Sequence, residues 1–223
     1  MNWKVLPQFR HSDFQESVEI PLTFVTVMRT VGEYQRNALL LRLSQREGYP
    51  ARLALKAELL PKMYRLRTRI NFLPTHRESW GALYVDGYLF AVQCTGRKVS
   101  WQVGRAIIND TPSEWPFEKD NKAPSVKDYF MSYDVGVEIL RQPRELTLSL
   151  KIGPSTGDAF FHDGPYGWLE IARITRTSSS RELGWWAFGS PPPIVTELPE
   201  RYRYDLEGPF VEFRDLEFAV PAE

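Results

Sequence analysis

The sequence predicts an all-β protein, an antiparallel two-sheet β-sandwich with at most short helical turns. The clearest observation is the alternation of side chains in residues 62–73. Tyr64, Leu66, Thr68, Ile70 and Phe72 fall on one side, and Arg65, Arg67, Arg69 and Asn71 on the other. Because the side chains of a strand point alternately to opposite faces, this run predicts a strand with one buried and one solvent-facing side. Turn residues separate further runs of this kind, and we find no long helical pattern and no internal repeat.

The first half of the chain contains four predicted strands. Residues 17–30 are rich in β-branched and aromatic side chains, and Pro21 indicates an edge or a bulge. Residues 38–45 fit a strand, with a short helix as the alternative. Residues 51–60 alternate again, and Pro61 ends that run before 62–73 begins. We expect the last three runs to form an antiparallel meander with short connections.

The second half continues with strands separated by turns and two long loops. Residues 81–96 contain Asp86-Gly87, a pair that favours a type I′ hairpin turn because both central positions need positive φ. The remaining predicted strands are 98–108, 133–141, 144–152, 168–177, 183–190 and 209–220. Prolines, glycines and mixed charges predict surface loops at 109–125 and 153–167.

Length and composition set the class of protein. With 223 residues, 43% of them hydrophobic, the chain suits a single β-sandwich domain over 1–223 with a sizeable core. The only cysteine, Cys94, excludes an internal disulfide and argues against a structural zinc site; we expect it to be buried and inert. We find no apolar run near 18 residues and no cleavable signal, so we expect no membrane partner and a cytoplasmic location. Export by a route that needs no such signal stays open.

Charge is balanced overall but uneven along the chain. Residues 1–110 carry 16 basic and 9 acidic side chains, and residues 111–223 carry 12 and 19. In a single sandwich these halves interleave and can compensate one another. Because the whole protein is neutral and has no recognisable nucleic-acid motif, we do not expect a nucleic-acid partner.

The final third of the chain resembles the closing strands of concanavalin-A-like jelly rolls, the lectin- and glucanase-like superfamily. The resemblance rests on LGWWAFGSP (183–191) and GPFVEFRDLEFAV (208–220). The expected packing residues are Val211, Phe213, Leu216 and Phe218, with a bulge at Arg214-Asp215 where the alternation slips. The resemblance implies a jelly roll of two curved sheets whose concave face binds glycans in many such families. The ExDxxE signature of its glycoside hydrolases is absent, so catalysis does not carry over.

A row of arginines is the first candidate site. Arg65, Arg67 and Arg69 lie about 6.6 Å apart along one strand face and could hold an acidic glycan or another carboxylate-bearing ligand. We expect Arg52 and Lys56 on the neighbouring strand. The alternatives are a solvated face paired with Glu58 and others, or edge protection by charge.

Aromatic and polar residues in the second long loop form another candidate. The residues are His162, Asp163, Tyr166 and then Trp168, which could stack on a sugar ring and bond its hydroxyls. Alternatively, Phe160 and Phe161 anchor this loop onto the core. Of Trp185 and Trp186, one should face the core and one outward, as a ligand platform or an interface; alternation does not decide which, and Trp185 is our ligand-binding candidate.

Metal, cofactor and nucleophile motifs are weak. His11 and Asp13 form HxD, and His162 follows far downstream, which is formally similar to a two-histidine, one-carboxylate iron site. No strands precede HxD to build the barrel such sites require, so we expect no metal and no cofactor. The sequence contains no GxSxG, Walker loop or GxGxxG motif.

These observations favour a non-catalytic carbohydrate-binding module, with acidic glycans among its candidate ligands and other small polar ligands not excluded. One alternative is a hydrolase or lyase on the same scaffold that uses His162 and Asp163. The other is a structural jelly-roll subunit whose tryptophans are buried in an assembly, and a homo-oligomer stays open.

Overall fold

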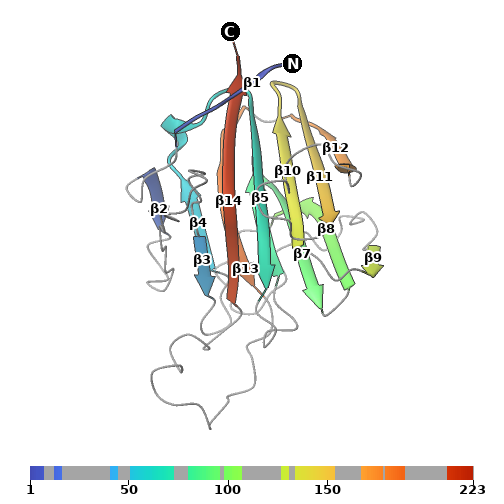
Figure 1. Cartoon of the computed structure of the whole chain (residues 1–223). Coiled ribbons are helices and arrows are strands. Elements are labelled where there is room, and N and C mark those ends of the chain that lie inside the picture. Colours follow the sequence, from blue (N-terminus) through green and yellow to red (C-terminus); the bar gives the residue numbers. More distant parts are fainter. Residues whose placement is uncertain are drawn as a thin grey trace, which may run out of the picture.

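The computed structural model is a sandwich of two antiparallel sheets packed face to face (Figure 1). It describes residues 1–7, 13–16, 41–44, 51–72, 80–95, 98–106, 127–130, 134–153, 167–177, 179–188 and 210–222. Within these ranges each sheet has seven strands, and every strand pair is antiparallel. The predicted all-β, two-sheet fold class is confirmed. None of the helical segments described is long and apolar enough to cross a membrane.

The first sheet has the strand order β1–β14–β5–β10–β11–β12, and β3 also pairs with β14. It contains the strands nearest to both chain ends, which lie side by side at the top of Figure 1. The strands are β1 (Trp3–Val5), β3 (Leu41–Ser44), β5 (Tyr64–Phe72), β10 (Asp134–Arg141), β11 (Glu145–Gly153), β12 (Leu169–Thr175) and β14 (Phe210–Pro221).

The second sheet has the order β2–β4–β13–β6–β7–β8–β9. Its strands are β2 (Phe14–Glu16), β4 (Ala51–Leu55), β6 (Trp80–Val85), β7 (Tyr88–Thr95), β8 (Lys98–Arg105), β9 (Lys127–Phe130) and β13 (Leu183–Phe188). Three of its central strands, β6, β7 and β8, follow one another along the chain, whereas β13 enters between β4 and β6 from far downstream. Cys94 lies within β7 opposite Val99, as predicted for a mid-strand position.

The core lies between the inner faces of the two sheets. Tyr64, Leu66, Thr68 and Ile70 of β5 are all buried, which confirms the predicted alternation. Tyr64, Leu66 and Ile70 pack in one apolar cluster with inward residues of the second sheet such as Phe90. The sheets approach so closely that a Cβ added to Gly81 on β6 would lie 2.7 Å from Val211 Cγ1 on β14.

Two local predictions are confirmed by the backbone. Asp86 and Gly87 have φ values of 49° and 89°, as the type I′ turn between β6 and β7 requires. The register between β14 and β5 shifts between Arg214 and Glu217, where three residues of β14 span two of β5. This is the predicted bulge, and it lets Phe213 and Leu216 both face the core although they are three residues apart.

The predicted meander over 38–73 is wrong. β3 lies within 38–45 as expected, but it pairs with β14, and β4 and β5 belong to different sheets. The predicted strand 51–60 ends at Leu55, and a short 3-10 turn over Ala57–Leu59 carries the chain from one sheet to the other. Leu60 is buried where the chain crosses, so burial at the sandwich edge outweighs local pairing. The predicted strand 17–30, and most of the loops 109–125 and 153–167, lie outside the described residues.

Candidate functional site

The predicted arginine row lies on the outer face of the first sheet and is largely paired with acidic residues. Arg65 Nη2 is 2.8 Å from Glu217 Oε1, and Arg67 Nε is 2.5 Å from Glu138 Oε2. These partners come from β14 and β10, which flank β5, so the paired-face alternative is correct but Glu58 is not the partner. Arg52 does not join this row, because β4 is in the other sheet, and Lys56 lies beyond the end of β4, before the 3-10 turn. The row therefore offers less uncompensated charge than the sequence suggested.

Tryptophans cover the same arginines. The Arg65 guanidinium carbon lies 5.1 Å from the ring centre of Trp3, and that of Arg67 lies 5.1 Å from the ring centre of Trp168. Lys151 Nζ is 5.9 Å from Trp168 as well. Trp168 thus takes part in cation–π contacts with side chains of its own sheet. The other predicted loop ligands, His162, Asp163 and Tyr166, precede it in the chain but lie outside the described residues.

Trp185 and Trp186 face opposite sides of β13, as predicted. Trp185 is 0% exposed and packs edge-on against Phe14 inside the core, with ring centres 5.5 Å apart. Our assignment of Trp185 to ligand binding is therefore wrong, because its ring is enclosed between the sheets. Trp186 lies on the outer side but is only 4% exposed. Its ring stacks on Tyr84 at 5.5 Å, and the Arg52 guanidinium lies 4.4 Å from its centre.

The outer side of the second sheet combines aromatic, amide and hydroxyl side chains, and we call it the aromatic face. It consists of Arg52, Trp80, Ala82, Tyr84, Leu89, Ala91, Gln93, Ser100, Gln102 and Trp186. Strand register places these residues in rows across the sheet, one of them Arg52–Trp186–Ala82–Ala91–Gln102 and another Trp80–Gln93–Ser100.

The aromatic face has a buried floor and a partly exposed rim. Ala82, Leu89 and Ala91 are fully buried and form the floor with Trp186. The remaining residues are partly exposed, namely Arg52, Trp80, Tyr84, Gln93, Ser100 and Gln102. A ligand on this face would therefore meet the rim side chains, while Trp186 supports Tyr84 and Arg52 from below.

Carboxylates are sparse on the aromatic face. The outward positions of β4, β13, β6, β7 and β8 hold no Asp or Glu, while Asp128 on edge strand β9 is opposite Ser100. Just before β13, Glu182 accepts a 2.8 Å hydrogen bond from the Tyr84 hydroxyl. Burial and this hydrogen bond raise the pKa of Tyr84 well above its ordinary value, so it stays a neutral donor.

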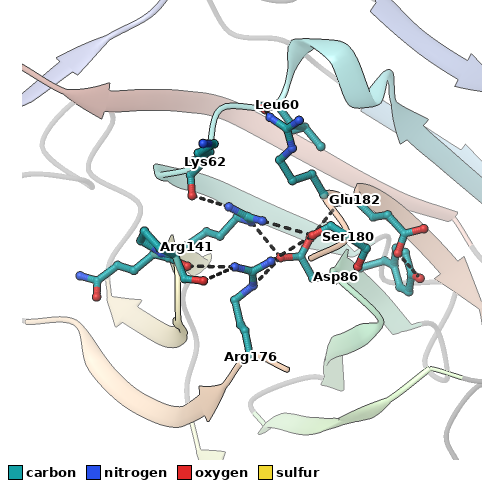
Figure 2. A network of polar contacts seen from close by, with 11 residues as sticks. Leu60, Lys62, Asp86, Arg141, Arg176, Ser180 and Glu182 are labelled. Atoms are coloured by element: carbon teal, nitrogen blue, oxygen red, sulfur yellow. Dashed lines mark hydrogen bonds and ion pairs between the residues drawn. The ribbon is translucent and has the colours of Figure 1, made fainter. Parts of the chain in front are cut away.

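A buried ion network joins the two sheets at the β6–β7 turn (Figure 2). Asp86 Oδ2 lies 2.8 Å from Arg141 Nε and 2.7 Å from Arg176 Nε, and all three side chains are at most 4% exposed. Asp86 Oδ1 also accepts a hydrogen bond of 2.9 Å from the Glu182 backbone N–H. The arginines belong to the first sheet and its following segment, so this network connects the layers.

Backbone carbonyl oxygens complete the surroundings of these arginines. Arg141 donates to the carbonyls of Lys62 and Ser180, and Arg176 donates to those of Gln142, Pro143 and Ser180. The two cations thus receive many acceptors but share a single carboxylate. From the sequence, only the Asp86-Gly87 turn was recognised; its arginine partners lie 55 and 90 positions away and no local pattern connects them.

Within the described part of the chain, no group of three or more His, Cys, Asp or Glu side chains could hold a metal ion. His11 and His162, the histidines of the formal iron-site pattern, lie outside the described residues, and Asp13 precedes β2. The absence of a metal and of a cofactor therefore stays a prediction.

A scan of protein-family models finds no match, and a search of curated proteins finds none either. Solved structures do match. The exoplasmic/lumenal domain of VIP36, in its Ca²⁺/Man2-bound form, superposes with a TM-score of 0.51 and 11% identity, over 97% of this chain and 86% of that one. The protein has the concanavalin-A-like lectin and glucanase fold. The predicted jelly-roll resemblance is thereby confirmed for nearly the whole chain rather than its last third.

A glycoside hydrolase family 16 endo-glucanase from Bacteroides ovatus also superposes. The superposition covers 98% of this chain and 99% of that one, at 9% identity and with a TM-score of 0.49. We base no conclusion on this match. At 11% identity, the likeness to the VIP36 domain establishes the fold alone, and function has to be argued from the residues of this chain.

Proposed function

We propose that the protein is a non-catalytic carbohydrate-binding module whose ligand lies on the aromatic face. The observation that supports this most is the composition of the rim, where the partly exposed rings of Trp80 and Tyr84 stand beside Gln93, Ser100 and Gln102. Sugars present C–H groups that pack on aromatic rings and hydroxyls that need both donors and acceptors. Ala82 and Ala91, the small residues of the floor, leave room for a sugar ring between the rim side chains.

Arg52 gives this face a preference for acidic ligands. Its guanidinium lies over the Trp186 ring, at the border of the rim, and can donate to a carboxylate or sulfate on the glycan. On the first sheet, Glu217 and Glu138 compensate the charges of Arg65 and Arg67. We therefore place the predicted contact with acidic glycans at the Arg52 guanidinium, in addition to the contact that it makes with Trp186.

Binding without catalysis fits the state of three glutamates of the first sheet. A glycosidase requires two carboxyl groups about 5–9.5 Å apart, one of them an acid with a raised pKa. Glu138 and Glu217 are instead held by arginines, and Arg173 lowers the pKa of Glu170 through a hydrogen bond. A glycan ligand on this fold has a precedent, because the VIP36 domain was solved in a Ca²⁺/Man2-bound form.

The proposal is tested with a panel of neutral oligosaccharides of mannose or glucose and acidic ones that contain uronates. Thermal unfolding identifies binders, because a ligand at a hundred times its Kd stabilises the folded state by about 2.7 kcal/mol. Isothermal titration then compares Trp80→Ala with the control Trp168→Ala, which removes a tryptophan that contacts Arg67 on the other sheet. We expect Trp80→Ala to weaken binding by more than about 1 kcal/mol, roughly fivefold, and Trp168→Ala to leave it unchanged.

Three results would contradict the proposal. If no member of the panel binds, the carbohydrate function is wrong. If Trp168→Ala abolishes binding and Trp80→Ala does not, the ligand lies on the first sheet, as the sequence first suggested. If the panel is cleaved, the hydrolase or lyase alternative is correct.

A further inference from the structure

A cavity of about 340 Å³ opens beside the β6–β7 turn, next to the buried ion network. Among the residues that line it are Asp86, Tyr88, Arg105, Arg176, Thr177 and Ser180. Its volume lies at the lower end of the range of about 300–1,000 Å³ typical of small-molecule sites. The cavity is separate from the aromatic face, so a ligand bound in it does not depend on the function proposed for that face.

Among the described residues that line the cavity, cationic side chains outnumber carboxylates. Among the described residues of the lining, Asp86 is the only carboxylate. One of its oxygens already lies against two buried arginines, Arg176 of the lining and Arg141 behind it. Arg105 adds a third guanidinium. Since Arg141 and Arg176 are almost inaccessible to water, their field is weakly screened and extends into the cavity. The cavity therefore favours a negatively charged occupant.

Arg105 is placed to contact that occupant. It is the last residue of β8 and lies on the same side of the strand as Trp101 and Val103, which face the core. At this end of the strand the inward side meets the cavity instead of the core, and register places Arg105 opposite Tyr88. Arg105 is exposed, and no acceptor for its guanidinium is found in the part of the chain that the structure describes.

The rest of the lining indicates what else the ligand contains. The hydroxyls of Thr177, Ser180 and Tyr88 can donate to or accept from ligand hydroxyls, and the Tyr88 ring supplies an apolar wall. A guanidinium recognises a planar carboxylate through two parallel hydrogen bonds. We propose that this cavity binds a small hydroxylated carboxylate of monosaccharide size, a sugar acid, with its carboxylate on Arg105.

Calorimetric titration with D-glucuronate tests this, and D-glucose serves as the matched neutral probe. Wild-type protein should bind glucuronate and not glucose. Arg105→Gln should weaken glucuronate binding roughly ten- to hundredfold, because it removes a charge-assisted pair. Arg173→Gln, an exposed arginine on β12, is the control and should bind as the wild type does. Because Arg105 is exposed and no hydrogen bond or ion pair of its side chain is found among the described residues, Arg105→Gln is expected to fold. Its unfolding temperature checks this.

Each other outcome overturns the proposal. If wild-type protein does not bind glucuronate, or if Arg105→Gln binds it equally well, the cavity is not the site. If glucose binds as tightly as glucuronate, no carboxylate is recognised. If inorganic sulfate competes at equal affinity, the site takes any small anion and the sugar-acid assignment fails. Because Trp80→Ala leaves this cavity intact, it should bind glucuronate normally, which separates this test from that of the aromatic face.

Discussion

Replacing Asp86 by asparagine removes the single carboxylate that two buried arginines share. Asparagine keeps the size of the side chain and tolerates the positive φ of 49° at this turn, so the backbone need not change. The side-chain amide oxygen of asparagine can still accept the hydrogen bond from the Glu182 backbone N–H. Arg141 and Arg176, 3% and 4% exposed, would however lose the carboxylate charge that they share.

Breaking a buried ion pair from one side typically costs about 3–5 kcal/mol, because the remaining charge is left uncompensated. For a domain of this size each 1 kcal/mol lowers the Tm by about 2–4 °C, so Asp86→Asn should lower it by roughly 6–20 °C. Urea unfolding measures the loss of free energy directly.

The matched control is Glu170→Gln, which removes the carboxylate partner of Arg173 in an exposed pair on β12. Exposed pairs contribute little because water and salt screen them, so this variant should unfold close to the wild-type temperature. If Asp86→Asn loses less than about 1 kcal/mol, or no more than Glu170→Gln, the network does not hold the sheets together and the reasoning is refuted.

Three further predictions concern the core. Gly81→Ala should lower the free energy of unfolding by about 1–3 kcal/mol in urea, since the new Cβ would lie 2.7 Å from Val211 Cγ1 and 3.0 Å from Ile70 Cγ2; an unchanged stability would mean that the sheets are less closely packed. Tyr64→Phe should raise stability by about 1 kcal/mol at neutral pH, because the buried Tyr64 hydroxyl has no hydrogen-bond partner in the described part of the structure; a loss of stability would show that it has one. Burial and the Asp86 charge raise the pKa of Tyr64 above its ordinary 10.0, so above pH 10 the unfolded chain loses a proton that the folded state keeps, and wild-type stability should fall as pH rises. The stability of Tyr64→Phe should fall less steeply than that of the wild type over the same pH range. Equal slopes of stability against pH would contradict this.

Much of the fold could be predicted because a strand or a turn is recognised from a few neighbouring residues. The alternation in 62–73, the Asp86-Gly87 turn and the slip between Phe213 and Leu216 each depend on a few neighbouring residues, and the structure confirms all three. The predicted meander was wrong because neighbouring residues do not show which strands pair. Which strands pair is decided by burial between distant segments, and β14 takes the place beside β5 that the sequence assigned to 51–60.

The site was harder to predict because its members come from distant strands. Trp186 meets Tyr84 and Arg52 only through the pairing of β13 with β6 and β4, which no local pattern shows. The sequence correctly placed Trp185 and Trp186 on opposite faces but could not say which face was the core. Likewise, the arginine row was visible from its spacing, whereas its compensation by Glu138 and Glu217 depends on strand order.

Backbone amide NMR during titration with the tightest-binding oligosaccharide of the panel tests the central claim most directly. If the glycan lies on the aromatic face, the largest shifts should fall on Tyr84, Gln93 and Ser100, in β6, β7 and β8. The amides of Arg65, Arg67 and Arg69 on the opposite sheet should barely move. Shifts concentrated on β5 and β10 instead would place the ligand on the arginine row and contradict the account.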